Sequence, residues 1–176
     1  RGRALARTGA IFEAPRFYDY LSGWRNLLIY SSYTAAVPRR DIEEVVEIVG
    51  LTGRVHDKVG TYSQGMRQRL GLAQALLPAN EVILLDEPTN GLDPEGVRWL
   101  RDFLRAFAAE GKTVFISGHV LAEVAQTVDR VVIIDKGRIE EDIRARNAAQ
   151  ASEEAREARA DVVITKDGTL EDLERT

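Results

Sequence analysis

The chain has 176 residues, enough for one domain or for a core with an inserted subdomain. A composition that is 44% hydrophobic and 30% charged is typical of a soluble globular protein, and a formal net charge of −4 gives no electrostatic basis for nucleic acid binding. The absence of cysteine excludes disulfides and thiolate metal sites. Its apolar runs are too short to span a membrane, and residues 1–20 lack an apolar signal-peptide core. We therefore expect no direct membrane insertion, and any membrane association would come through a partner.

A short strand is predicted at residues 8–12, and Glu13 follows at its end. The chain begins abruptly before this strand, which suggests that a beginning has been lost. On the residues alone, Glu13 is interpreted simply as an acid that ends a strand.

Three helices are predicted after this strand, at residues 24–36, 41–49 and 64–77. The second has apolar residues at helical spacing, with Asp41 as a candidate cap and Gly50 as a stop. Residues 14–78 are therefore predicted to form a small helical subdomain, inserted before a strand that starts at residue 82.

Ser63 is a natural N-cap for the third helix, whose apolar face comprises Met66, Leu70, Ala73 and Leu77. One interpretation is therefore a well-capped structural helix. A helix N-terminus that combines Ser63, free backbone N–H groups and the small Gly65 is also a candidate anion site.

Four apolar residues at 82–85 run into two adjacent carboxylates, Asp86 and Glu87. This pattern predicts a buried strand that ends at the edge of a parallel sheet, where α/β proteins bind their ligands. Asp86 is a candidate Mg²⁺ ligand, and Glu87 could polarise an attacking water. The alternative is that both acids are simply solvated where the strand ends.

Asp93, Pro94 and Glu95 predict the start of a helix, as an N-cap, a first-position proline and a first-turn acid. An apolar stripe follows, and Gly111 is predicted to end the helix. Gly111-Lys112-Thr113 is not a phosphate-binding loop, because that motif lies between a strand and a helix and has an earlier glycine where residue 106 is alanine. No other glycine precedes Lys-Ser or Lys-Thr, so the sequence contains no Walker A motif.

The remaining elements are predicted in order along the chain. They are a strand at 113–117, His119 at the start of a helix that extends to about 128, a strand at 131–134, a hairpin turn at 135–139, a helix at 141–160, a strand at 160–165 and a helix at 169–175. On physical grounds alone, His119 would be an exposed first-turn residue.

Four stretches resemble motifs of the ABC-type ATPases. Residues 82–94 resemble the Walker B segment and D-loop, residues 61–70 the signature motif, residues 117–124 the H-loop, and Glu13 with the following Pro-Arg-Phe-Tyr the Q-loop of the antibiotic-export branch, of the bacitracin and lantibiotic type. The usual signature Leu-Ser-Gly-Gly-Gln is here Tyr62-Ser63-Gln64-Gly65-Met66, so Gln64 replaces the first glycine.

The resemblance implies a fold and a set of roles. The fold would be an α/β, P-loop NTPase-like (RecA-like) core at residues 1–13 and 79–140, with a mostly parallel sheet flanked by helices and with the inserted helical subdomain. The cofactors would be ATP and Mg²⁺. The implied roles are metal binding by Asp86, catalysis by Glu87 and His119, nucleotide contacts by Glu13, Ser63, Gln64 and Gly65, and a link between the two sites of a dimer by Asp93.

The resemblance also implies partners and a location. An ABC ATPase works with a transmembrane permease subunit and a second ATPase domain, so the chain would be cytoplasmic and peripheral to the inner face of the membrane. Because the Walker A segment is missing, we expect no ATPase activity from this chain alone. The alternative is a non-catalytic folding or interaction module.

Residues 141–176 resemble a different protein, the C-terminus of dephospho-coenzyme A kinases, in Arg146–Glu154, Ala160–Ile164 and Asp167–Glu171. This suggests a chimera of two P-loop proteins, and a plain family member with an unusual tail is the alternative. The missing Walker A strand should leave a gap in the sheet unless the tail strand at Val162 fills it.

Overall fold

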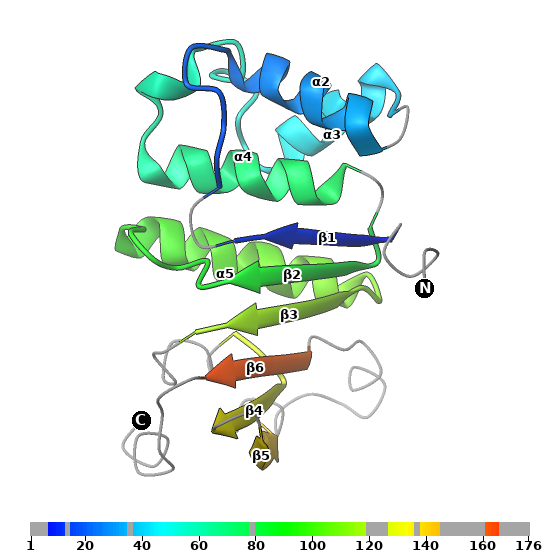
Figure 1. The fold of residues 1–176 in the computed structure, drawn as a ribbon, viewed down its shortest axis with the longest axis vertical. Helices are drawn as coiled ribbons and strands as arrows, with labels where there is room; N and C mark the ends of the chain where they lie inside the picture. Colours follow the sequence, from blue (N-terminus) through cyan, green and yellow to red (C-terminus); the bar gives the residue numbers. More distant parts are fainter. Residues whose placement is uncertain are drawn as a thin grey trace. The chain divides into compact units, whose positions relative to one another are not determined.

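The computed structural model describes residues 7–12, 15–34, 37–77, 80–118, 127–135, 138–144 and 161–165. Its elements are β1 (Thr8–Ile11), α2 (Gly23–Thr34), α3 (Arg39–Ile48), a 3-10 turn (Val59–Thr61), α4 (Gln64–Leu76), β2 (Val82–Asp86), α5 (Pro94–Ala109), β3 (Thr113–Ser117), β4 (Arg130–Asp135), β5 (Arg138–Arg144) and β6 (Asp161–Thr165). The strand order is β1-β2-β3-β6-β4-β5 (Figure 1). The predicted α/β fold is confirmed.

The chain divides into two compact units, Arg1–Ile83 with Gly91–Asp93, and Leu84–Asn90 with Pro94–Thr176.

The first unit contains the three predicted helices. Helix α3 ends as predicted at Gly50, which has φ +69°. The amide of Gly50 donates to the Glu47 carbonyl and that of Leu51 to the Val46 carbonyl, both at 2.9 Å, which is a Schellman motif. The predicted cap was wrong, because Pro38 holds the N-cap position and Asp41 lies in the first turn. Proline is tolerated there because a helix start needs no donor from it.

Helix α4 is the central helix of this unit. Its residues face β1 so closely that a Cβ at Gly9 would overlap the Ala75 carbonyl oxygen, and one at Gly71 would lie 2.8 Å from Pro15. Asn80 Nδ2 also donates to the Ala75 carbonyl. Glycines at 9 and 71 therefore set how closely the first strand and the following segment approach α4.

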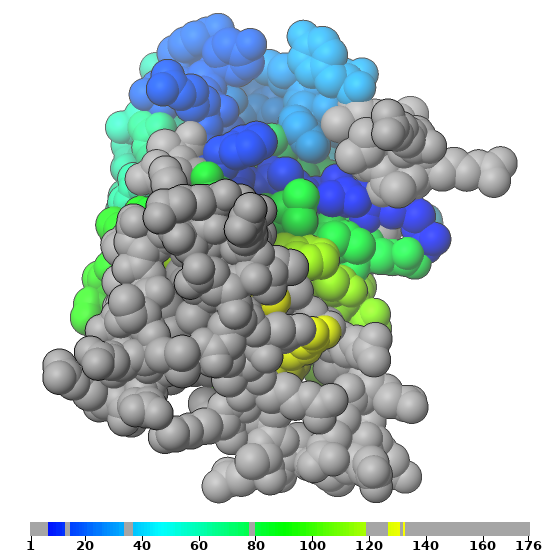
Figure 2. All heavy atoms as spheres, turned by 60° about the horizontal axis from the view of Figure 1, so that its bottom comes forward, coloured from blue at the N-terminus to red at the C-terminus, as the bar shows by residue number. Residues whose placement is uncertain are grey.

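The two flanking helices of the unit, α2 and α3, meet at an aromatic contact. The Arg39 guanidinium lies 5.1 Å from the centre of the Trp24 ring, a cation–π geometry. In Figure 2, the atoms of these helices are among the blue spheres at the top of the view. The core of the unit consists of side chains that are almost fully buried: Leu27, Ile42, Val46, Val49, Leu51, Val59, Leu70 and Leu72.

Tyr62 connects this core to the start of α4. Its ring is buried, and its hydroxyl donates to the Arg54 carbonyl at 2.8 Å. Burial raises the pKa of the Tyr62 hydroxyl, and the negative charge of Asp57 adds to the effect, while Arg54 and a hydrogen bond to the Gly23 backbone oppose it. The neutral phenol is therefore the form that the folded state favours.

In the second unit, β6 lies between β3 and β4 (Figure 1). It pairs in parallel with both neighbours: Val163 is opposite Ile116, and Ile164 is opposite Ser117 on one side and Val132 on the other. The strand predicted at 160–165 is confirmed, and it fills the place between β3 and β4.

The predicted hairpin is confirmed by the antiparallel pairing of β4 with β5, in which Asp135 is opposite Arg138. The predicted helix at 141–160 was wrong at residues 141–144, which belong to β5. Pairing with β4 overrides the helical propensity of this charged stretch, and β5 is an edge strand, where charged residues are common. The rest of that prediction, and those for the helices at 119–128 and 169–175, fall wholly or almost wholly on residues that the structure does not describe.

Helix α5 covers β3 with the predicted apolar stripe. Leu100, Leu104 and Phe107 are buried, and Val114 and Ile116 of β3 are buried as well. Gly111, with φ +80°, ends the helix, and its amide donates to the Ala108 carbonyl at 2.9 Å. The interpretation of Gly111-Lys112-Thr113 as a helix stop before a strand is confirmed. No helix within the described part of the chain is long and apolar enough to cross a membrane.

The first prediction concerns Gln68, which is 2% exposed in α4. Among the described residues, neither its Nε2 nor its Oε1 has a hydrogen-bond partner. A buried unpaired polar group costs about 1–3 kcal/mol, so we expect Gln68→Met to raise the free energy of unfolding by about 1–2 kcal/mol. Urea unfolding measures this, with Gln74→Met, at a half-buried position of the same helix, as the control. A less stable Gln68→Met variant would contradict the prediction.

The second prediction uses the raised pKa of Tyr62. The neutral form of Tyr62 contributes its full stabilisation below pH about 10, the pKa of tyrosine in the unfolded chain. This stabilisation is lost as the pH rises through the pKa of Tyr62 in the folded state. The free energy of unfolding should therefore fall above pH 10, and Tyr62→Phe should weaken this dependence and cost about 1 kcal/mol at neutral pH for the lost Arg54 hydrogen bond. Urea unfolding between pH 7 and about 11 tests this. Tyr33→Phe, at a ring that is 81% exposed, is the control and should change neutral-pH stability by less than about 0.5 kcal/mol.

Candidate functional site

Strand β2 brings two carboxylates to its end, as predicted. Ile83 and Leu85 are 0% and 2% exposed and fix the strand in the core, whereas Asp86 is exposed and Glu87 half-buried. Asp86 is the last residue of β2, and the backbone turns sharply at Glu87, which has φ +45°. Glu87 is the only described non-glycine residue with a positive φ, in a region that side chains usually avoid.

Ser117, the last residue of β3, contacts both acids. Its hydroxyl donates to Asp86 Oδ1, and the Glu87 amide donates to the Ser117 hydroxyl at 3.0 Å and to the Ser117 carbonyl at 3.2 Å. The adjacent strand therefore fixes the carboxylate of Asp86 and the backbone of Glu87 together. No prediction from the sequence gave Ser117 a role, although it opens the stretch that resembles the H-loop.

A turn over residues 87–90 orients the Glu87 side chain. The Asn90 amide donates to the Glu87 carbonyl at 3.1 Å, and Asn90 Nδ2 donates to Glu87 Oε2. No prediction from the sequence gave Asn90 a role of its own. The turn and the Asn90 side chain therefore restrain the direction of the Glu87 carboxylate.

Two predicted site residues, Glu13 and His119, lie outside the described residues. Within the described segments, no three His, Asp or Glu side chains are grouped to hold a metal ion. The exposed Asp86 carboxylate fits the usual mode of Mg²⁺ binding in phosphate-processing sites, through one or two carboxylates, several waters and substrate oxygens.

The predicted anion site belongs to the first unit. Ser63 is the N-cap of α4, and its hydroxyl accepts from the Met66 amide at 3.2 Å, so the predicted capping is confirmed. Gly65 has room for a side chain, because an added Cβ would come no closer than 3.8 Å to Leu92. Internal packing therefore does not require glycine at position 65.

The same unit includes the short segment Gly91–Asp93. Gly91 has φ +71°, and an added Cβ would lie 3.2 Å from Cγ of Gln64. Gln64, the residue that departs from the usual signature, therefore packs against the Gly91 backbone. Asp93 is exposed and directly precedes the first residue of α5, as the predicted N-cap would. Ser63, Gln64 and Gly65 thus lie with the segment 91–93, whereas Asp86 and Glu87 belong to the second unit.

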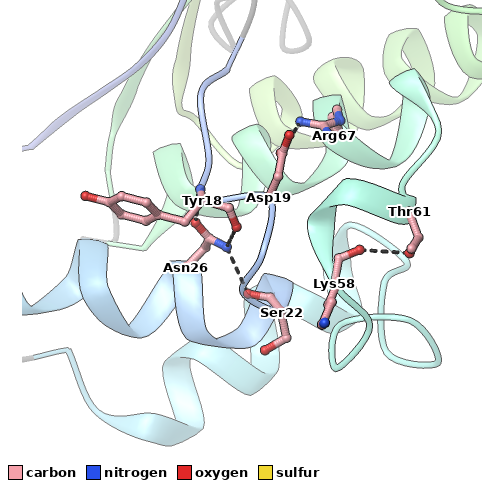
Figure 3. Close-up of polar contacts among 7 residues, drawn as sticks. All are labelled: Tyr18, Asp19, Ser22, Asn26, Lys58, Thr61 and Arg67. Carbon is pink, nitrogen blue, oxygen red and sulfur yellow. Dashed lines mark hydrogen bonds and ion pairs between the residues drawn. The ribbon is translucent and has the colours of Figure 1, made fainter.

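Figure 3 shows a loop before α2 that is bonded to Asn26 of α2 and to Arg67 of α4. Asn26 is buried and contacts the Tyr18 backbone on both sides: its Oδ1 accepts from the amide at 2.8 Å and its Nδ2 donates to the carbonyl at 3.2 Å. Asp19 forms an ion pair with Arg67 of α4 at 2.9 Å. The Asp19 carbonyl also accepts from the Gly60 amide at 2.9 Å.

These contacts connect the loop after Glu13 to the start of α4, and the sequence analysis did not predict them. Exposed aromatic rings lie in this loop and at residue 12, just before Glu13. Phe12, Tyr18 and Tyr20 are 74%, 51% and 70% exposed, and the Tyr18 and Tyr20 rings make an edge contact at 5.9 Å.

Comparison with known proteins gives consistent results. The family model of ABC transporters matches residues 3–90. An uncharacterised ABC transporter ATP-binding protein of Bacillus subtilis, YhcH, is 51% identical over 138 residues, which are 78% of this chain and 45% of that protein. The bacitracin transport ATP-binding protein BcrA of Bacillus licheniformis is 46% identical over 79% of this chain and 46% of its own length. A fluoroquinolones export ATP-binding protein of Mycobacterium tuberculosis is 38% identical over 76% and 44%.

The chain spans about half the length of the curated relatives that it matches. Among solved structures, the ATP-binding subunit of an ABC transporter matches with a TM-score of 0.68 at 23% identity, over 81% of this chain and 60% of that one. This likeness concerns the fold. Because the family model matches half of the chain, residues 3–90, the chain belongs to the ABC transporter family.

Proposed function

We propose that this chain contains part of the ATP-hydrolysing machinery of an export-type ABC transporter. The observation that carries the proposal is the pair of carboxylates at the end of β2, held by Ser117 and Asn90 in a strained backbone turn. Strained residues held by their surroundings are concentrated at functional sites. The names of the relatives, which include bacitracin transport and fluoroquinolones export, support an export role.

In this proposal, Glu87 orients the attacking water and Asp86 holds the Mg²⁺ of the nucleotide. Phosphoryl transfer to water depends mainly on positioning and on neutralisation of charge, and Mg²⁺ supplies that neutralisation when it is bound. The half-buried Glu87 carboxylate, with one oxygen bonded to Asn90, suits a group that must point in one direction. His119 and Glu13 are proposed, from the motif resemblance, to contact the γ-phosphate and to sense the metal and water.

The start of α4 is proposed to bind the nucleotide held by a second ATPase domain. A capped helix N-terminus presents backbone N–H groups to an anion, and the helix dipole adds to the attraction. Gly65 supports this role, because glycine in a helix costs stability and nothing inside this unit requires it. Its lack of a side chain lets the backbone approach a phosphate closely. Asp93 is proposed as the link between the two sites.

The partner on the membrane side is proposed to be a transmembrane permease subunit, which contacts the exposed aromatic loop. Single exposed hydrophobic side chains are normal on a protein surface, but residues 12–20 contain three aromatic rings that are more than half exposed. The contacts of Asn26 and of Asp19 would carry a displacement of this loop to the start of α4. The proposed location is the cytoplasmic face of the membrane.

We propose that the 176 residues alone do not hydrolyse ATP. They contain no Gly-x-x-x-x-Gly-Lys-[Ser/Thr] motif to bind the phosphates. Each charge-assisted hydrogen bond missing from such a loop would weaken binding by roughly 1.5–3 kcal/mol.

A second candidate function is a non-catalytic folding or interaction module. It is favoured by β6, which completes the sheet between β3 and β4. In that case Asp86 and Glu87 would be inherited from a catalytic ancestor but would have no catalytic role in this chain. The chimeric origin of residues 141–176 remains part of this second proposal.

The third prediction separates packing from ligand binding at Gly65. If glycine is kept for an external phosphate, Gly65→Ala should raise the free energy of unfolding by about 0.5 kcal/mol, because alanine is the better helix former and the site has room for Cβ. Urea unfolding measures the change. Gly9→Ala is the control and should destabilise strongly, since its Cβ would overlap the Ala75 carbonyl. A loss of stability in Gly65→Ala would show that packing requires the glycine.

The fourth prediction concerns Mg-ATP. Isothermal titration of this chain should detect negligible binding, the melting temperature should not respond to Mg-ATP, and no ATPase activity should be measurable. A chain to which a P-loop segment has been restored should bind, and Glu87→Gln in that chain should abolish turnover while binding remains. Magnesium-dependent turnover by the 176-residue chain that is lost in Glu87→Gln, or a melting shift of several degrees, would overturn the proposed inactivity.

A further inference from the structure

One hydroxyl group, that of Ser117, connects both carboxylate-bearing residues of the candidate site. As a donor it bonds Asp86 Oδ1, and as an acceptor it takes the Glu87 amide at 3.0 Å. A serine hydroxyl has one proton and two lone pairs, so it makes both bonds at once without conflict. Neither alanine nor valine at this position could make either bond.

The Glu87 backbone needs such support. With φ +45° it lies in the left-handed region, which is unfavourable for a residue with a side chain. Its amide is bonded twice to Ser117, through the hydroxyl at 3.0 Å and the carbonyl at 3.2 Å, and its carbonyl accepts from Asn90. Hydrogen bonds to both the amide and the carbonyl of Glu87 therefore hold the turn. Substitution of the Ser117 side chain can remove the bond between its hydroxyl and the Glu87 amide.

The bond to Asp86 acts on the other residue. Asp86 is exposed, so without a partner its carboxylate would rotate freely in water. With Oδ1 bonded to Ser117, the rotation of the carboxylate is restrained and Oδ2 has a preferred direction. A fixed ligand loses less freedom when it binds a metal ion.

We propose that Ser117 is a positioning residue that orients the Asp86 carboxylate for a divalent cation and holds the Glu87 turn in its strained conformation. The inference rests on the proposed function, which gives Asp86 and Glu87 their roles, and it adds a residue on β3 that acts through both. Threonine should serve in its place, because it keeps the hydroxyl and suits a strand.

The experiment compares the whole chain with Ser117→Ala, Ser117→Thr and Ser117→Val. Threonine and valine have the same shape, so the pair isolates the hydroxyl. The first readout is the exchange rate of the Glu87 amide proton by NMR, and the second is the Mn²⁺ concentration that broadens the amide signals of residues 85–88. Asp86→Asn is the control for the metal readout, and urea unfolding of each variant confirms that it is folded.

We expect the wild type and Ser117→Thr to agree in both readouts. In Ser117→Ala and Ser117→Val, the Glu87 amide should exchange about tenfold faster, and the Mn²⁺ concentration for half-maximal broadening should rise about five- to tenfold, the effect of one lost hydrogen bond. Equal exchange rates in the threonine and valine variants would overturn the inference, and so would equal Mn²⁺ responses in these two. If Mn²⁺ broadens nothing in the wild type, the metal role of Asp86 in the proposed function fails, and the exchange rates alone decide whether Ser117 holds Glu87.

Discussion

The candidate site depends on how the backbone leaves strand β2. The strand is anchored by Ile83 and Leu85, and the chain then turns at a residue with φ +45°. A turn of this kind persists only where its surroundings determine it, and here the support comes from Ser117 on the adjacent strand and Asn90 three residues further on. The adjacent strand, through Ser117, and the loop, through Asn90, thus set the direction of the Glu87 side chain together.

In the helical unit, several contacts hold the start of helix α4 in place. The first turn of α4 is capped by Ser63, tied through Arg67 to Asp19, and preceded by the buried ring of Tyr62. Position 65 is glycine, so no side chain at this position covers the first amides of the helix. The result is a capped helix start whose first residues, Ser63 and Gln64, are exposed, which is compatible with the proposed anion site.

The sequence predicted most of the elements because their signals are local. Apolar spacing identified α3, α4 and α5, and Gly50 and Gly111 marked two of their ends correctly. It failed at Asp41, where a proline took the cap position, and at residues 141–144, where pairing with β4 outweighed helical propensity. In the first case the N-cap lies three residues before Asp41, at Pro38, which makes no side-chain capping bond, and in the second case β4 supplies the pairing.

Site residues divide in the same way. Asp86, Glu87 and Ser63 could be found because each sits beside an element whose pattern is clear in the sequence. Ser117, Asn26 and the ion pair of Asp19 with Arg67 could not, because their partners are 31, 8 and 48 positions away and are adjacent only in the folded chain. A serine at the end of a strand looks the same in the sequence whether its hydroxyl meets water or a carboxylate.

The place of β6 in the sheet also has a consequence for how the protein folds. Strands β3 and β4 follow one another in the chain but pair with β6 and not with each other, so neither has both of its neighbours until residues 161–165 have been synthesised. Until then, the growing chain has two unpaired strand edges, rich in valine and isoleucine, that can pair with other exposed strands. Long-range parallel pairing is also slow to form. The second unit should therefore be the part of this chain that needs a chaperone during synthesis.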